Sequence, residues 1–199
     1  LGDESDTNNK ITPLGDKIYL GLASFSGNKG QIQLDVKRLD EIYTINYGTN
    51  NYPNNVTQSH RKHLARKIIG LSANGGTPTP YAYAEAAAYL MGTKTGSSSY
   101  GDSTTNYTQP TSISSQTTTE LKKCSAQGIY FLTDGRPEPN GGINVARDLM
   151  RYALNDQSSN EFNCSSSPMG NNGPYYSPDN NGWACVGKFN ENLLLKNGK

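Results

Sequence analysis

The stretch that decides the fold is an apolar run closed by an acidic residue and a glycine. It reads Gln127-Gly128-Ile129-Tyr130-Phe131-Leu132-Thr133-Asp134-Gly135. A short apolar run bounded by turn-forming residues is typical of a strand buried on both faces, so we predict a buried strand that ends at Asp134. Ligands of open α/β sheets bind at the carboxyl ends of strands, which makes Asp134 a candidate metal ligand, catalytic acid or phosphate-site residue. Because Asp-Gly is also a common turn pair, the alternative is that Asp134 only caps the next turn.

Further strands and helices are predicted on either side of this run. Residues 17–26 form another apolar run, closed by Gly27-Asn28, and residues 31–37 alternate polar and apolar side chains. Helical patterns cover residues 60–71, the alanine-rich stretch after Pro80, residues 143–154 and residues 183–195. Buried strands that alternate with amphipathic helices predict an α/β fold with a mostly parallel central sheet and helices on both faces.

The helix predicted at 60–71 has one apolar side and several basic residues. Leu64, Ile68 and Leu71 recur at i, i+4 and i+7, so this side is expected to face the core. His60 and His63 stand three residues apart at the start of the helix. We interpret them as solvated helix residues, with a metal-binding pair as the alternative.

Length and composition favour one domain with long polar loops. The 199 residues suit a single domain, 1–199, with surface insertions at about 93–120 and 156–182. Hydrophobic residues make up 33% and charged residues 18%, which indicates a modest core and the polar neutral sequence of an exported protein. A net charge of +1 gives no general electrostatic reason to bind nucleic acid or an acidic membrane. No apolar run approaches the length of a transmembrane helix.

A glycine-rich loop precedes the alanine-rich helix and carries two threonines. It reads Asn74-Gly75-Gly76-Thr77-Pro78-Thr79-Pro80. Either threonine can cap the helix, which is the commonest role of this residue at such a position. Alternatively, the hydroxyl is a hard oxygen ligand for Mg²⁺, Mn²⁺ or Ca²⁺.

Taken together, the Gly-Gly-Thr loop and the Thr-Asp-Gly strand end resemble a von Willebrand factor A domain. In that family these two segments supply two of the three arms of a metal-ion-dependent adhesion site, so the resemblance implies Thr77 and Asp134 as ligands of Mg²⁺ or Ca²⁺. The family's first arm is an Asp-x-Ser-x-Ser sequence. Asp3 and Ser5 have this spacing, with an ordinary acidic loop as the alternative. The fold that the resemblance implies is Rossmann-like.

A second likeness narrows the family. The segments 130–138 and 182–189 are similar to the PilC/PilY family of type IV pilus-associated proteins. The resemblance covers residues 17–199 apart from the two insertions, and missing outer segments indicate a fragment. It implies an adhesion module at the bacterial cell surface, pilus tip or outer membrane that engages a pilus subunit or a host cell-surface receptor. We predict no enzymatic activity. The alternatives are a structural domain with a degenerate metal site and a hydrolase or phosphotransferase that uses Asp134.

The three cysteines are relevant to the prediction that the protein is exported. Cys164 and Cys185 flank a polar loop, and in an exported protein they are expected to close it as a disulfide. The alternative is two unrelated thiols. Cys124 is left over, either to pair outside the fragment or to stay a buried thiol.

Overall fold

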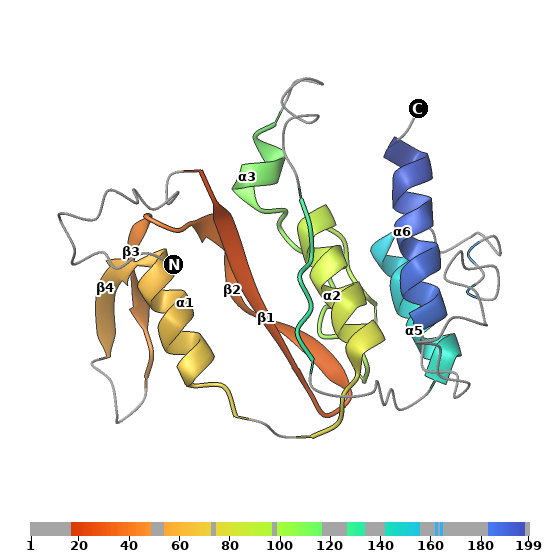
Figure 1. Cartoon of the computed structure of the whole chain (residues 1–199), viewed down its shortest axis with the longest axis horizontal. Helices are drawn as coiled ribbons and strands as arrows, with labels where there is room; N and C mark the ends of the chain where they lie inside the picture. The colour runs from red at the N-terminus through yellow and green to blue at the C-terminus, as the bar shows by residue number, and fades with distance from the viewer. Residues whose placement is uncertain are drawn as a thin grey trace. The chain divides into compact units, whose positions relative to one another are not determined.

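The computed structural model describes residues 17–48, 54–72, 75–96, 99–116, 127–133, 142–155, 162, 164 and 183–197 (Figure 1). Its strands are β1 (Tyr19–Ser26), β2 (Lys29–Arg38), β3 (Ile42–Asn46) and β4 (Asn55–Ser59). Its helices are α1 (His60–Ile69), α2 (Thr79–Met91), α3 (Thr111–Ser114), α5 (Gly142–Ala153) and α6 (Trp183–Asn197).

The strands form two antiparallel pairs instead of one parallel sheet. β1 pairs with β2, and β3 pairs with β4. Two residues, Gly27 and Asn28, join the first pair, whereas parallel neighbours need a crossover connection of a dozen residues or more. Since no strand in the described ranges lies in a parallel sheet, the prediction of a Rossmann-like von Willebrand factor A fold is wrong.

The apolar run on which that prediction depended is not a strand. Residues 127–133 lie outside regular secondary structure, and Tyr130 and Leu132 are exposed. β1 is not buried on both faces either, since Tyr19 and Leu20 are exposed. Apolar composition therefore identified segments whose side chains pack on other parts of the chain. It did not identify their partners, because strand pairing depends on segments far away in the sequence.

The chain divides into two compact units. Unit 1 comprises Leu1–Leu22 and Gln33–Ser72, and unit 2 comprises Ala23–Ile32 and Ala73–Lys199. The hairpin β1–β2 therefore contributes residues to both.

Unit 1 is small, with a core of Leu34, Leu39 and Leu64 against which Leu22 and Ile45 pack. The β3–β4 pair runs in register from Ile42 opposite Ser59 to Asn46 opposite Asn55. The sequence analysis predicted neither strand, because both have only five residues and β4 carries a single apolar one, Val56. The helix α1 follows β4 directly, and it does not bury the side that periodicity predicted. Leu64 is buried, but Ile68 and Leu71 are exposed.

Unit 2 has a core built from three helices that lie alongside one another, α2, α5 and α6 (Figure 1). All three lie close to where the sequence patterns predicted helices. The small side chains of α2 allow other segments to approach its backbone: a Cβ built on Gly30 of β2 would lie 2.5 Å from the Cα of Ala82. The hydroxyl of Tyr81 donates a hydrogen bond of 3.2 Å to the carbonyl oxygen of Gly142, at the start of α5.

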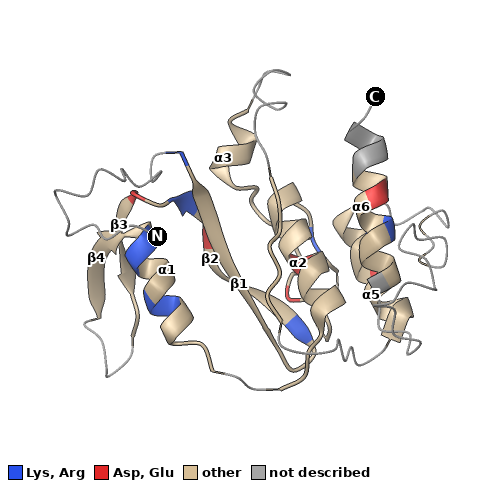
Figure 2. Ribbon diagram, in the orientation of Figure 1, with Lys and Arg blue, Asp and Glu red and all other residues tan. Residues whose placement is uncertain are grey.

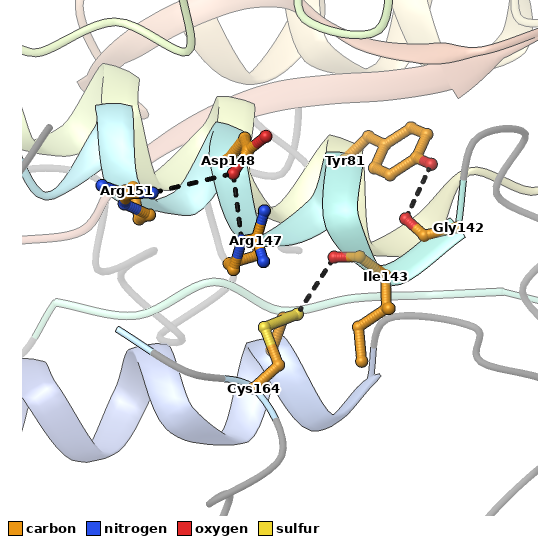
Figure 3. The surroundings of a disulfide bond; sticks show 8 residues. Tyr81, Gly142, Ile143, Arg147, Asp148, Arg151 and Cys164 are labelled. Carbon is orange, nitrogen blue, oxygen red and sulfur yellow. Dashed lines mark hydrogen bonds and ion pairs between the residues drawn. A yellow bond between two sulfur atoms is a disulfide. The ribbon is translucent and has the colours of Figure 1, made fainter. Parts of the chain in front are cut away.

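The predicted disulfide between Cys164 and Cys185 is present (Figure 3). It links Cys164 to the first turn of α6, with 4.4 Å between the two Cα atoms. Both cysteines are buried in the core of unit 2, and the sulfur of Cys185 lies 3.7 Å from the carbonyl oxygen of Ile143. The third cysteine, Cys124, lies outside the described residues. The covalent link thus fastens the segment around Cys164 to the three-helix core.

Candidate recognition surface

The segment 127–133 alternates between side chains that pack inward and side chains that face solvent. Ile129 packs against the core of unit 2, and the ring of Phe131 stacks on Phe25 with 5.4 Å between centroids. Tyr130, which lies between these two residues, is 90% exposed, and Leu132, which follows Phe131, is 79% exposed. This alternation has the period of a β-strand, although the segment is not in a sheet. Two large apolar side chains are therefore held outward by their inward neighbours.

The backbone of this segment is also without internal partners. Among the described residues, the amide and carbonyl groups from Gln127 to Leu132 make no hydrogen bond to the rest of the chain. The segment carries no charged side chain. Backbone groups of this kind are satisfied either by water or by a partner chain. The segment therefore combines exposed apolar side chains with available backbone donors and acceptors.

The Gly-Gly-Thr loop lies in the same unit and has a structural reason for its first glycine. Gly75 has a φ of +88°, and a Cβ there would lie 2.4 Å from the amide nitrogen of Gly27. Any larger residue would push the loop away from the turn of the hairpin. The glycine is thus explained by this close approach, without reference to a ligand.

Neither threonine of this loop caps α2. The N-cap residue is Pro78, and no side chain makes a capping hydrogen bond. Thr77 is half-buried, and its carbonyl oxygen accepts a hydrogen bond of 2.8 Å from the amide of Thr79. The side chain of Thr79 is fully buried, and its hydroxyl has no hydrogen-bond partner.

The structure describes only one of the four predicted metal ligands. Thr77 is described, whereas Asp134, Asp3 and Ser5 lie outside the described residues. Within the described ranges, no group of three His, Cys, Asp or Glu side chains could hold a metal ion. The Mg²⁺ or Ca²⁺ site thus stays a prediction.

A buried carboxylate, missed by the sequence analysis, organises part of the predicted insertion 93–120. Glu85 of α2 is almost completely buried, and its Oε2 accepts hydrogen bonds from the Thr95 hydroxyl at 2.7 Å and the Asp102 amide at 2.8 Å. Its Oε1 accepts one from the Tyr107 hydroxyl at 2.5 Å. Burial, reinforced by the hydrogen bond to Glu85, raises the pKa of Tyr107. A lone acidic residue inside an alanine run was the available signal, since such a residue must find donors if its helix packs on all sides.

The two histidines of α1 are buried, and the prediction that they are solvated is wrong. His60 Nε2 lies 2.6 Å from the carbonyl oxygen of Leu20, and His63 Nε2 lies 3.0 Å from that of Tyr43. A carbonyl only accepts, so each Nε2 carries a proton, and when the ring is neutral its Nδ1 is an acceptor. The hydroxyls of Tyr43 and Tyr47 donate to these Nδ1 atoms at 2.7 Å and 2.6 Å. The imidazole nitrogens are thus occupied within unit 1, which leaves neither of them available to a metal.

No family model matches this chain. No curated protein and no solved structure is detectably similar to it either. The resemblance to the PilC/PilY family therefore stays a prediction that rests on the quoted residues. Among the described helices, none has the length and apolar character needed to cross a membrane.

Proposed function

We propose that the chain is a binding module of an exported, type IV pilus-associated surface protein, and that it holds a protein partner through residues 127–133. The observation that carries the proposal is the outward display of Tyr130 and Leu132 on an uncharged segment. A few side chains at the centre of an interface supply most of its binding energy, and tyrosine is among the commonest of these. An exposed pair fixed by inward neighbours would lose little conformational freedom on binding.

The disulfide supports the part of the proposal that says the protein is exported. Disulfides persist in oxidising compartments and are rare in reducing ones. The bond between Cys164 and Cys185 lies in the core of unit 2, the unit that carries the exposed segment. The partner, a pilus subunit or a host cell-surface receptor, comes from the family resemblance alone.

The test is a binding titration of the purified chain against purified type IV pili and against host cells. The variant Tyr130→Ser/Leu132→Ser should weaken binding at least about tenfold, because it removes both exposed anchors. A matched control is Ile42→Ser, which removes a similarly exposed apolar side chain from β3. It should bind as the unchanged chain does. Absence of binding to either target, or equal binding by the double variant, would refute the proposal.

The same assay decides whether a cation takes part. If Mg²⁺ or Ca²⁺ bridges the partner, then EDTA and the variant Thr77→Ala should each weaken binding, and added Mg²⁺ should restore only the unchanged chain. If the apolar pair alone holds the partner, neither change should matter.

A further inference from the structure

The helix α1 concentrates positive charge that the rest of the chain balances. The helix sequence is His60-Arg61-Lys62-His63-Leu64-Ala65-Arg66-Lys67-Ile68-Ile69. It holds four of the 18 basic residues and no acidic residue, although the net charge of the whole chain is only +1 (Figure 2). The average over the chain, which predicted no affinity for acidic membranes, therefore does not describe this helix.

The C-terminal end of α1 exposes apolar side chains, of which Ile69 lies on the same face as Lys62. Lys62, Ala65, Arg66 and Ile69 follow the i, i+3, i+4, i+7 spacing opposite the buried His60, His63 and Leu64. Ile69 is 78% exposed, Ile68 is 52% exposed and Leu71 is 44% exposed. Hydrogen bonds from Gly70 to Arg66 and from Leu71 to Ile68 keep the chain compact past the last turn. The helix thus presents basic residues beside a small apolar end.

The two basic residues of the last turn, Arg66 and Lys67, lie over the ring of Tyr47. The guanidinium carbon of Arg66 lies 5.3 Å from the ring centre of Tyr47, and Nζ of Lys67 lies 5.9 Å from it. That ring is itself held by the hydrogen bond between its hydroxyl and His63. Cations placed over an aromatic ring keep a preferred position, so this end of the helix is organised before any partner arrives.

We propose that this face of α1 docks on an anionic lipid surface. Anionic headgroups provide charge complementary to the basic residues, and the acyl boundary just beneath them accepts apolar side chains such as Ile68 and Ile69. A soluble polyanion would meet the charge but would leave these isoleucines in water. The helix has 10 residues, a length of about 15 Å, so it lies on the bilayer and does not cross it. The proposal concerns unit 1 only and does not depend on the proposed function.

The experiment is sedimentation of the whole chain with vesicles. One set contains phosphatidylglycerol mixed with phosphatidylcholine, and the other contains phosphatidylcholine alone. The chain should bind the first set and not the second, and salt should weaken binding several-fold because it screens the charge. The variant Ile68→Ser/Ile69→Ser should lower partitioning about tenfold or more. The variant Lys62→Gln, which removes the exposed cation of this face, should lower it several-fold.

Two controls keep the result decisive. The variant Ile42→Ser removes an exposed apolar side chain at the other end of α1, about 14 Å away along the helix, and should bind vesicles unchanged. Circular dichroism should show that every variant is folded, as expected for exposed positions. Equal binding to both vesicle sets, no binding, or full binding by the double isoleucine variant would overturn the proposal. Binding to heparin that matches binding to vesicles and survives the isoleucine variant would also overturn it, because the surface would then recognise polyanions in general.

Discussion

At the residue scale, Glu85 shows how one buried charge can order a polar loop. Its carboxylate accepts three hydrogen bonds from donors within residues 95–107. The variant Glu85→Gln replaces one oxygen by an NH₂ group that points at a donor. We expect it to lower the free energy of unfolding of unit 2 by about 2 kcal/mol.

Chemical denaturation followed by circular dichroism measures this loss. The matched control is Glu191→Gln on α6, which removes a partly exposed ion pair with Lys188. Pairs of this kind contribute at most about 1 kcal/mol, so the control should change stability much less. Equal effects of the two variants would mean that the Glu85 hydrogen bonds do not hold the loop.

His60 makes the stability of unit 1 depend on pH. Burial lowers its pKa below the usual value. The carbonyl of Leu20 and the carboxylate of Glu41 raise the pKa in part, and electrostatic interactions with Lys37 and His63 lower it. Above the unfolded-state pKa of about 6.5, both states hold a neutral imidazole and stability does not change. Below it, the unfolded state binds the proton first, so the free energy of unfolding falls as the pH falls.

Unfolding of the chain measured from about pH 7.5 to about pH 5 should show this decline for β3, β4 and α1. The variant His60→Gln removes the titrating group and should make the decline shallower, even if its stability at neutral pH is lower. Tyr43, whose pKa burial raises to about 12, stays protonated throughout this range. A slope unchanged in the variant would show that His60 does not cause the decline.

At the scale of elements, the contact between β2 and α2 depends on one missing side chain. A methyl group on Gly30 would collide with the backbone of Ala82, which cannot rotate away as a side chain could. We expect Gly30→Ala to destabilise unit 2 by about 1–3 kcal/mol, since the strand and the helix must separate. Gly128→Ala is the control, because a Cβ there meets nothing within 4 Å. Thermal unfolding compares them, and equal melting temperatures would contradict the close approach.

The elements that the sequence predicted well are those determined locally. α2 begins beside Pro80 and contains five alanines, strong helix formers, among its 13 residues, and the break between β1 and β2 lies at Gly27-Asn28, where the turn residues indicated it. β3 and β4 escaped prediction because their alternation is carried by polar residues such as Thr44 and Thr57, which pair with each other. For α1 the apolar periodicity was real. Its inward side was nevertheless decided by His60 and His63, whose polar atoms found partners on neighbouring strands.

At the scale of the whole molecule, the fold class was out of reach because it depends on long-range pairing. The run 127–133 has the composition of a central strand, yet Phe131 packs on Phe25 through its ring and the backbone joins no sheet. Composition reports that a segment is apolar and does not report which segment lies beside it. The candidate site shared this difficulty. The sequence analysis placed the candidate ligand at Asp134, which lies outside the described residues, whereas the described part of the same stretch displays Tyr130 and Leu132. The disulfide was predictable, because loop length and an exported composition were sufficient.

The division into two units predicts that acid and reductant act on different parts of the molecule. Both histidines of the chain, His60 and His63, belong to unit 1, and the disulfide between Cys164 and Cys185 belongs to unit 2. Reduction should destabilise unit 2 by about 3 kcal/mol, the chain-entropy value for a loop of this length, and should leave unit 1 unchanged. Mild acid should destabilise unit 1, because burial lowers the pKa of His60 and the unfolded state therefore binds the proton first. Hydrogen exchange resolved by segment measures both effects, with rates corrected for the pH dependence of intrinsic exchange. Under reductant the amides of α5 and α6 should lose protection while those of β3 and β4 keep it, and at about pH 5 the pattern should reverse. If the amides of both units lose protection together under either condition, the two units unfold as one. Acid and reductant would then act on a single transition, and this prediction would be wrong.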